Sequence, residues 1–196
     1  MNRLTHLVLA IAAIAIIPHS AFAHVGIGAT ASFIAGLEHP FSGLDHIAAM
    51  VAVGLWAALK GGRALWLWPV AFVSAMLIGG ALGMAYVAVP FVEPGILASV
   101  VVLGLLVALA ADLPLPVGAA IIAMFAIFHG HAHGAELPPG ANAMAFSVGF
   151  VIATGLLHLA GIAFGLLGRW PRGRIAVRTM GGVIAVAGLV FLGRLA

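Results

Sequence analysis

HPFSGLDHIAAM, residues 39–50, decides the fold because it sets two histidines and an aspartate at the start of a long apolar run. Ionisable side chains are costly inside a membrane segment, so they usually face the bundle interior and mark a pathway. A second polar stretch, FHGHAHGAE at residues 128–136, ends another apolar run. We expect the two stretches to meet in space and to form a metal path.

The composition indicates a membrane protein with several spans. Of the 196 residues, 64% are hydrophobic and 7% are charged, and the mean hydropathy is +1.26. Uncharged runs of at least about 18 residues are candidate membrane helices, and this chain contains several of them. We therefore predict an all-α fold, a polytopic helical bundle in a lipid bilayer.

The residue types also restrict the chemistry. The chain has no cysteine, which excludes disulfides, thiolate metal sites and thiol catalysis. A bound metal would be held by histidine, carboxylate, methionine, backbone or water. The high pI of 10.7 rests on few charges, whose positions follow membrane topology, so we expect no nucleic-acid partner.

Residues 1–23 have the pattern of a cleavable signal peptide. Arg3 supplies a positive start, residues 7–17 an apolar core, and Ala21-Phe22-Ala23 a cleavage site with small residues. Cleavage would leave His24 as the mature N-terminus outside the cytoplasm, and the alternative is an uncleaved first helix. Residues 24–196 then form one six-helix domain.

The expected spans follow a short segment, residues 24–38, which is short for a span and more typical of an external or re-entrant segment. They cover Gly43–Leu59, Leu65–Val89, Gly95–Ala111, Val117–His131, Ala143–Leu167 and Ile175–Leu195. Gly79 and Gly83 have the four-residue spacing that allows two helices to approach closely, as do Gly161 and Gly165.

The basic residues predict the orientation. Lys60 and Arg63 follow the first span, and four arginines lie around the connection between the fifth and sixth spans. If both connections are cytoplasmic, six of the mature chain's seven basic residues lie inside and Arg194 lies outside, as the positive-inside rule requires. The acids and histidines of both motifs then gather at the outer, periplasmic face of a bacterial inner membrane.

The first motif admits a functional and a structural interpretation. Pro40 and Gly43 favour a bend that folds His39 back toward Asp45 and His46. The Asp45 carboxylate would then bind metal or orient a ligand imidazole. Alternatively, Ser42 and Asp45 form a helix-capping box, which would explain neither histidine.

In the second motif, His129 and His133 are four residues apart and share one face of a helix, whereas His131 points away from them. Zinc peptidases use this spacing but require glutamate directly after the first histidine, where this chain has Gly130. The alternative is a solvated, histidine-rich loop, which suits His131 and Glu136 best.

Other polar residues have weaker assignments. Glu93 before Pro94 is either a helix-start acid or a metal-attracting group. Asp112 is typical of a cytoplasmic turn. His158 lies about 20 Å along its helix, either as a hydrogen-bonded core residue or as a ligand. The wider set of candidate metal ligands therefore comprises His24, Glu38, Glu93, His131 and His158.

The two motifs, read as HPFSGLDHIAAMVAVGLWA and FHGHAHGAE, closely resemble those of the HupE/UreJ family of six-helix permeases, and the resemblance covers essentially the whole chain. It implies import of nickel, in some members cobalt, in association with hydrogenase and urease. It implies roles in metal transport for His39, Asp45, His46, His129, His133 and Glu136.

The resulting hypothesis is a permease that passes divalent nickel or cobalt inward, with the metal as cargo and no permanently bound cofactor. Nickel-enzyme maturation proteins are expected functional partners, and a homo-oligomer is compatible with the sequence. The alternatives are an intramembrane metal enzyme, a haem-binding membrane protein with axial ligands among His46, His129 and His158, and a metal sensor or chaperone partner.

Overall fold

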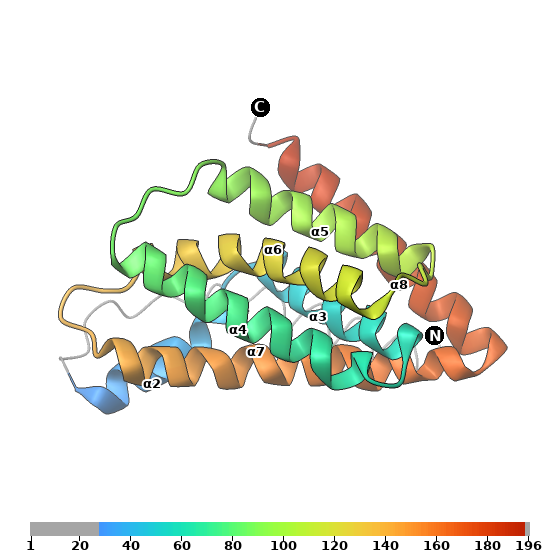
Figure 1. Ribbon diagram of the computed structural model, residues 1–196, viewed down its shortest axis with the longest axis horizontal. Helices are drawn as coiled ribbons and strands as arrows, with labels where there is room; N and C mark the ends of the chain where they lie inside the picture. Colours follow the sequence, from blue (N-terminus) through green and yellow to red (C-terminus); the bar gives the residue numbers. More distant parts are fainter. Residues whose placement is uncertain (1–27, 195–196) are drawn as a thin grey trace, which may run out of the picture.

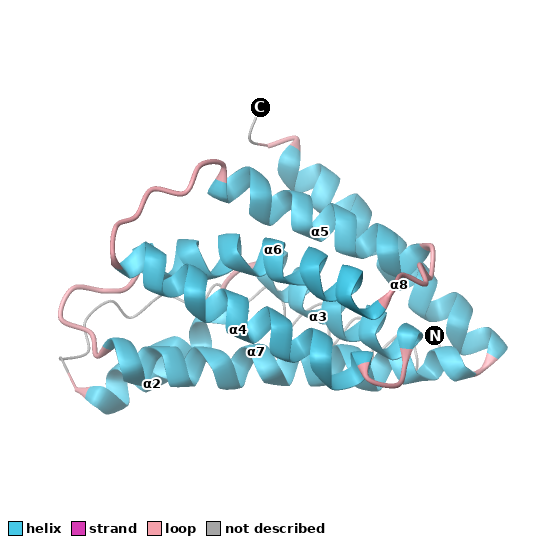
Figure 2. Ribbon diagram, viewed as in Figure 1, coloured by secondary structure: helices cyan, strands magenta, loops and turns pink. Residues whose placement is uncertain are grey.

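The computed structural model describes residues 28–194, and all regular structure in this part of the chain is helical (Figure 2). The helices are α2 (Ala29–Glu38), α3 (Leu44–Lys60), α4 (Ala64–Met84), α5 (Val92–Ala108), α6 (Leu115–Ala135), α7 (Ala143–Gly165) and α8 (Pro171–Leu192), with 3-10 turns η1 (His39–Phe41) and η2 (Leu166–Arg169). The predicted signal peptide and His24 lie outside the described residues.

Each of the six expected spans corresponds to one helix, α3 to α8. Among the described residues, four helices are long and apolar enough to cross a membrane: α4, α6, α7 together with η2, and α8. A fifth span results if α2–η1 and α3 are counted as one broken element, because they meet at a bend of 78°. The remaining apolar helix, α5, has only 17 residues.

Helix α4 ends earlier than the sequence predicted, at Met84 and not at Val89. The chain turns directly after it, where Tyr86 adopts a left-handed conformation (φ 54°). Phe91 is also left-handed (φ 59°) and directly precedes α5 as its N-cap residue. Left-handed residues interrupt a right-handed helix, and hydropathy alone does not register this interruption because the turn is itself apolar.

Helix α3 lies at the centre of the bundle and contacts α4, α5, α7 and α8. Eight of its residues between Ala49 and Ala57 are buried, including Met50 and Trp56. The remaining strong packing pairs are α4 with α6, α5 with α8 and α2 with α7. Because α3 is central, the largely buried Asp45 and His46 of its first turn lie beside other helices.

Glycines hold α4 against α6 at backbone contact distance. A Cβ atom on Gly79 or Gly83 would lie 2.2 or 2.3 Å from a carbonyl oxygen of α6. A Cβ atom on Gly130 or Gly134 would lie 1.9 or 2.1 Å from a carbonyl oxygen of α4. Such distances exclude any larger residue without helix displacement, so the predicted close packing at Gly79 and Gly83 is confirmed, with two further glycines from the partner helix.

The two ends of the bundle differ in chemistry. The α3–α4, α5–α6 and α7–α8 connections lie at one end, while the α4–α5 and α6–α7 connections lie at the other (Figure 1). At the first end Lys60, the last residue of α3, pairs with Asp112 in the α5–α6 turn. The opposite end carries the start of α3 and the end of α6, which are the two histidine motifs.

Candidate metal centre

The bend before α3 presents His39 and His46 to the bundle interior. Pro40 begins the short turn η1, and Gly43, in extended conformation, is the residue that precedes α3. Gly43 caps α3 without a side-chain hydrogen bond, and the Ser42 hydroxyl donates to the His39 carbonyl at 2.7 Å. The capping-box interpretation of Ser42 is therefore wrong.

Asp45 instead holds His46. Its Oδ1 accepts hydrogen bonds from the His46 backbone N–H and from the His46 Nδ1–H, both at 2.9 Å. A neutral imidazole carries one proton, so Nε2 of His46 keeps a free lone pair. This atom is buried and has no hydrogen-bond partner.

Helix α6 continues to Ala135, so the whole histidine run is helical and not a loop. His129 and His133 are both buried, at 0% and 7% exposure. His131 lies on another face, where its Nε2–H donates to the carbonyl of Val87 at 2.8 Å. His131 thus ties α6 to the α4–α5 connection, while its two neighbours face the bundle interior.

The two motifs meet although their histidines are 83 or more positions apart in the chain. The His46 ring lies 4.8 Å from the His129 ring and 4.4 Å from the His133 ring, measured between centroids. The His39 ring lies 4.7 Å from the His133 ring. His133 therefore contacts the histidines on both sides of the bend.

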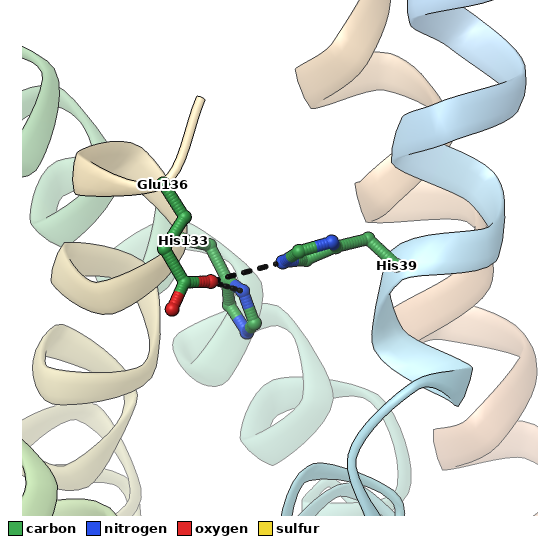
Figure 3. Close-up of side chains that lie close together, drawn as sticks. All are labelled: His39, His133 and Glu136. Atoms are coloured by element: carbon green, nitrogen blue, oxygen red, sulfur yellow. Dashed lines mark hydrogen bonds and ion pairs between the residues drawn. The ribbon is translucent and has the colours of Figure 1, made fainter. Parts of the chain in front are cut away.

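Within the described part of the chain, the side chains of His39, His133 and Glu136 form a cluster of possible metal ligands (Figure 3). Glu136 Oε2 lies 3.3 Å from His39 Nε2 and 3.9 Å from His133 Nδ1. One ligand atom from each residue falls within 4.8 Å of the others. Bonds of about 2.1 Å place ligand atoms roughly 3 to 3.5 Å apart around a metal, so a small contraction would close the cluster on a divalent ion.

Glu136 stands at the C-cap of α6 and is the exposed member of the cluster. The hydrogen bond from His39 lowers the pKa of its carboxyl group, with a smaller opposing effect of partial burial. The carboxylate is therefore anionic over the ordinary range of external pH. An anion beside two imidazoles suits a borderline divalent cation.

Several buried side-chain nitrogens of the bundle have no hydrogen-bond partner. In the described part of the chain, every buried side-chain nitrogen or oxygen that lacks a hydrogen-bond partner belongs to a histidine, namely His46, His129, His133 or His158. Leaving such a group unpaired costs about 1–3 kcal/mol, so each instance calls for an explanation. Binding of a metal ion by these nitrogens, one after another, would explain why they have no other partner.

Comparison with known proteins identifies the family. The family model described as HupE / UreJ protein matches residues 11–191. The chain belongs to the HupE/UreJ family. Protein HupE of Rhizobium leguminosarum bv. viciae is 48% identical over 176 residues, which cover 90% of this chain and 92% of the relative. No solved structure matches the chain.

Four of the wider set of candidate ligands lie outside the cluster: His131, described above, and Glu38, Glu93 and His158. Glu38 is exposed at the end of α2, and Glu93 is exposed in the first turn of α5. His158 is buried on α7, with the Phe72 ring 5.0 Å from its own ring. The same Phe72 ring lies 5.8 Å from the ring of His129, so an aromatic side chain contacts both histidines.

Sequence reasoning missed Ser99. This residue is fully buried on α5, and its hydroxyl contacts Nε2 of His129 at 2.8 Å. A single serine inside the apolar run GILASVVVLGLLVA was the available signal. Its significance depends on which helix α5 faces, and that information is absent from the local sequence.

Proposed function

We propose that this HupE/UreJ protein is a permease that imports nickel, or cobalt, from the periplasm into the cytoplasm. The observation that carries the proposal is the set of buried histidine nitrogens without hydrogen-bond partners, which starts at His133 in the His39–His133–Glu136 cluster. The metal is the transported substrate and not a resident cofactor. Its delivery would serve the maturation of nickel enzymes.

The order of the ligands supports a stepwise path. Glu136 is the exposed member of the His39–His133–Glu136 cluster and His39 is half-buried beside it, so these two would meet a periplasmic ion first. His133 would accept the ion next, because it belongs to the cluster and also contacts His46. His46 and His129 would follow, with Asp45 orienting His46. His158 would lie further along, beyond Phe72.

The ligand types suit the proposed cargo. Imidazole and carboxylate groups bind nickel and cobalt, whereas a soft cuprous ion prefers sulfur ligands. Transport also requires binding that is strong enough for capture and weak enough for release. Sites of two or three ligands, without cysteine, meet both requirements.

The proposed topology has six spans after a cleaved signal peptide, in the bacterial inner membrane. Helices α3 and α5 have 17 residues each, about 25 Å at 1.5 Å per residue, which is close to a hydrocarbon core of about 30 Å. The mature N-terminus and the histidine end would be periplasmic. The opposite end carries most of the basic residues, as expected for the cytoplasmic side.

Two rival functions fit the geometry less well. A zinc-peptidase mechanism would require a glutamate at position 130, where a Cβ atom would lie 1.9 Å from the Met76 carbonyl oxygen. A haem sandwiched between His46 and His129 would require the porphyrin plane to pass between two rings whose centroids are only 4.8 Å apart. A permease requires neither feature.

Uptake of radiolabelled nickel tests the proposal in cells that lack other nickel importers. Expression of the chain should increase accumulation, and the Glu136→Gln variant should lose most of it at limiting metal. Glu38→Gln is the matched control, because Glu38 is also an exposed acid at a helix end near the bend. Equal uptake with and without the wild-type chain would refute the permease.

A further inference from the structure

The buried Ser99 hydroxyl contacts a backbone carbonyl and an imidazole nitrogen, and it has a single proton to donate. Its Oγ donates to the carbonyl of Ile96 at 2.6 Å, one turn earlier in α5. The same oxygen lies 2.8 Å from Nε2 of His129. Because the hydroxyl donates its single proton to Ile96, Ser99 Oγ can serve His129 only as an acceptor of the Nε2–H.

This arrangement fixes the tautomer of His129. With its one proton on Nε2, a neutral imidazole keeps a lone pair on Nδ1. That Nδ1 atom is buried and has no hydrogen-bond partner. In the other tautomer Nδ1 would carry the proton and would have no lone pair to offer a metal.

We propose that Ser99 is a positioning residue, which holds His129 as the Nε2–H tautomer so that Nδ1 is free to bind the transported metal. The inference rests on the proposed function and adds a residue from a third helix to the path. Asp45 has the equivalent relation to His46, since it accepts Nδ1–H and leaves Nε2 free.

The two supports differ in charge. A carboxylate partner raises the basicity of a ligand histidine, whereas a serine hydroxyl adds no net charge. His129 would therefore hold the metal less tightly than His46 does. A weaker position deeper in the path favours onward movement, because each site must also release its ion.

The first test is the tautomer itself. Nitrogen-15 NMR of histidine-labelled full-length protein, in lipid nanodiscs without metal, distinguishes protonated from unprotonated ring nitrogens. A His129→Gln variant assigns the signal. The wild-type protein and Ser99→Thr should show His129 protonated at Nε2, and Ser99→Ala should lose this preference.

The second test is nickel uptake as a function of nickel concentration. Loss of a residue that supports a metal ligand typically costs 10–100-fold in affinity or activity. Ser99→Ala should therefore raise the half-saturating nickel concentration about 10-fold or more, and Ser99→Thr should restore it. Ser32→Ala is the matched control, because Ser32 is a buried serine that accepts a hydrogen bond from Asn142 N–H, away from the histidines.

Three results would overturn the assignment: a wild-type His129 protonated at Nδ1, a Ser99→Ala variant with unchanged tautomer and half-saturation, or a Ser99→Thr variant as impaired as Ser99→Ala. The tautomer measurement requires no transport. Absence of nickel uptake by the wild-type chain would therefore refute the proposed function, while the spectrum would still decide the role of Ser99.

Discussion

Replacement of His133 by alanine should separate metal binding from folding. His133 belongs to the His39–His133–Glu136 cluster and also contacts His46. The variant therefore removes one of the three clustered ligands and also interrupts the proposed transfer of the metal to His46. Removing a ligand should exceed the 10–100-fold loss that typically follows removal of a supporting residue. We expect the initial rate of uptake at limiting nickel to fall about 100-fold or more.

The structure also indicates that the variant folds. Truncation of a large buried side chain costs about 2–5 kcal/mol in a well-packed core, and the His133 ring packs against Phe150 at 4.5 Å. However, both ring nitrogens are buried without hydrogen bonds, and their removal regains about 1–3 kcal/mol each in desolvation cost. The two effects largely offset each other, so membrane abundance should change little.

The assay is labelled-nickel uptake, normalised to the amount of protein in the membrane. His131→Ala is the matched control: it removes the same side chain two residues away, on another face of α6, and it loses the hydrogen bond to Val87. It should retain most uptake. If His131→Ala impairs uptake as much as His133→Ala at equal abundance, the proposed path through His133 is wrong.

Four further outcomes follow from the same structure. N-terminal sequencing of the membrane-inserted protein should begin at His24, and retention of Met1 would show that the signal is not cleaved. An impermeant thiol reagent should label cysteine at the exposed Pro139 from outside but not cysteine at the exposed Arg172, and the reverse pattern would invert the direction of transport. The hydrogen bond from His39 lowers the pKa of the Glu136 carboxyl group, so this carboxylate should stay charged as external pH falls through the ordinary glutamate range. The difference in nickel uptake between the wild type and Glu136→Gln should persist over this range, and its disappearance there would contradict the role of Glu136. Gly130→Ala should reduce the amount of folded protein, since its Cβ would lie 1.9 Å from a backbone oxygen, and normal abundance with an unchanged melting temperature would contradict the close α4–α6 contact.

Much of the fold was predictable because membrane helices depend on local hydropathy. The six apolar runs, the glycine pair Gly79 and Gly83, and the bend that Pro40 and Gly43 favour are all properties of short segments. The helical spacing of His129 and His133 likewise follows from a fixed rotation per residue. These predictions require no knowledge of which helices are neighbours.

The arrangement of the site was less predictable because it depends on contacts between distant segments. From the sequence, His39 was expected to fold toward Asp45 and His46, and Glu136 suited a solvated loop, whereas the structure gathers both with His133. Ser99 was missed because its partner lies 30 residues away on α6. Ser42 was misassigned because the cap of α3 depends on the backbone bend and not on the spacing of polar residues.

Nickel flux into sealed vesicles tests the central claim most directly. Purified protein reconstituted into proteoliposomes, with a nickel-sensitive dye inside, should admit added nickel faster than empty liposomes do. The flux should be saturable, and His133→Ala should abolish most of it while His131→Ala should not. A flux that equals that of empty liposomes, or one that His133→Ala leaves unchanged, would contradict a histidine-lined nickel path.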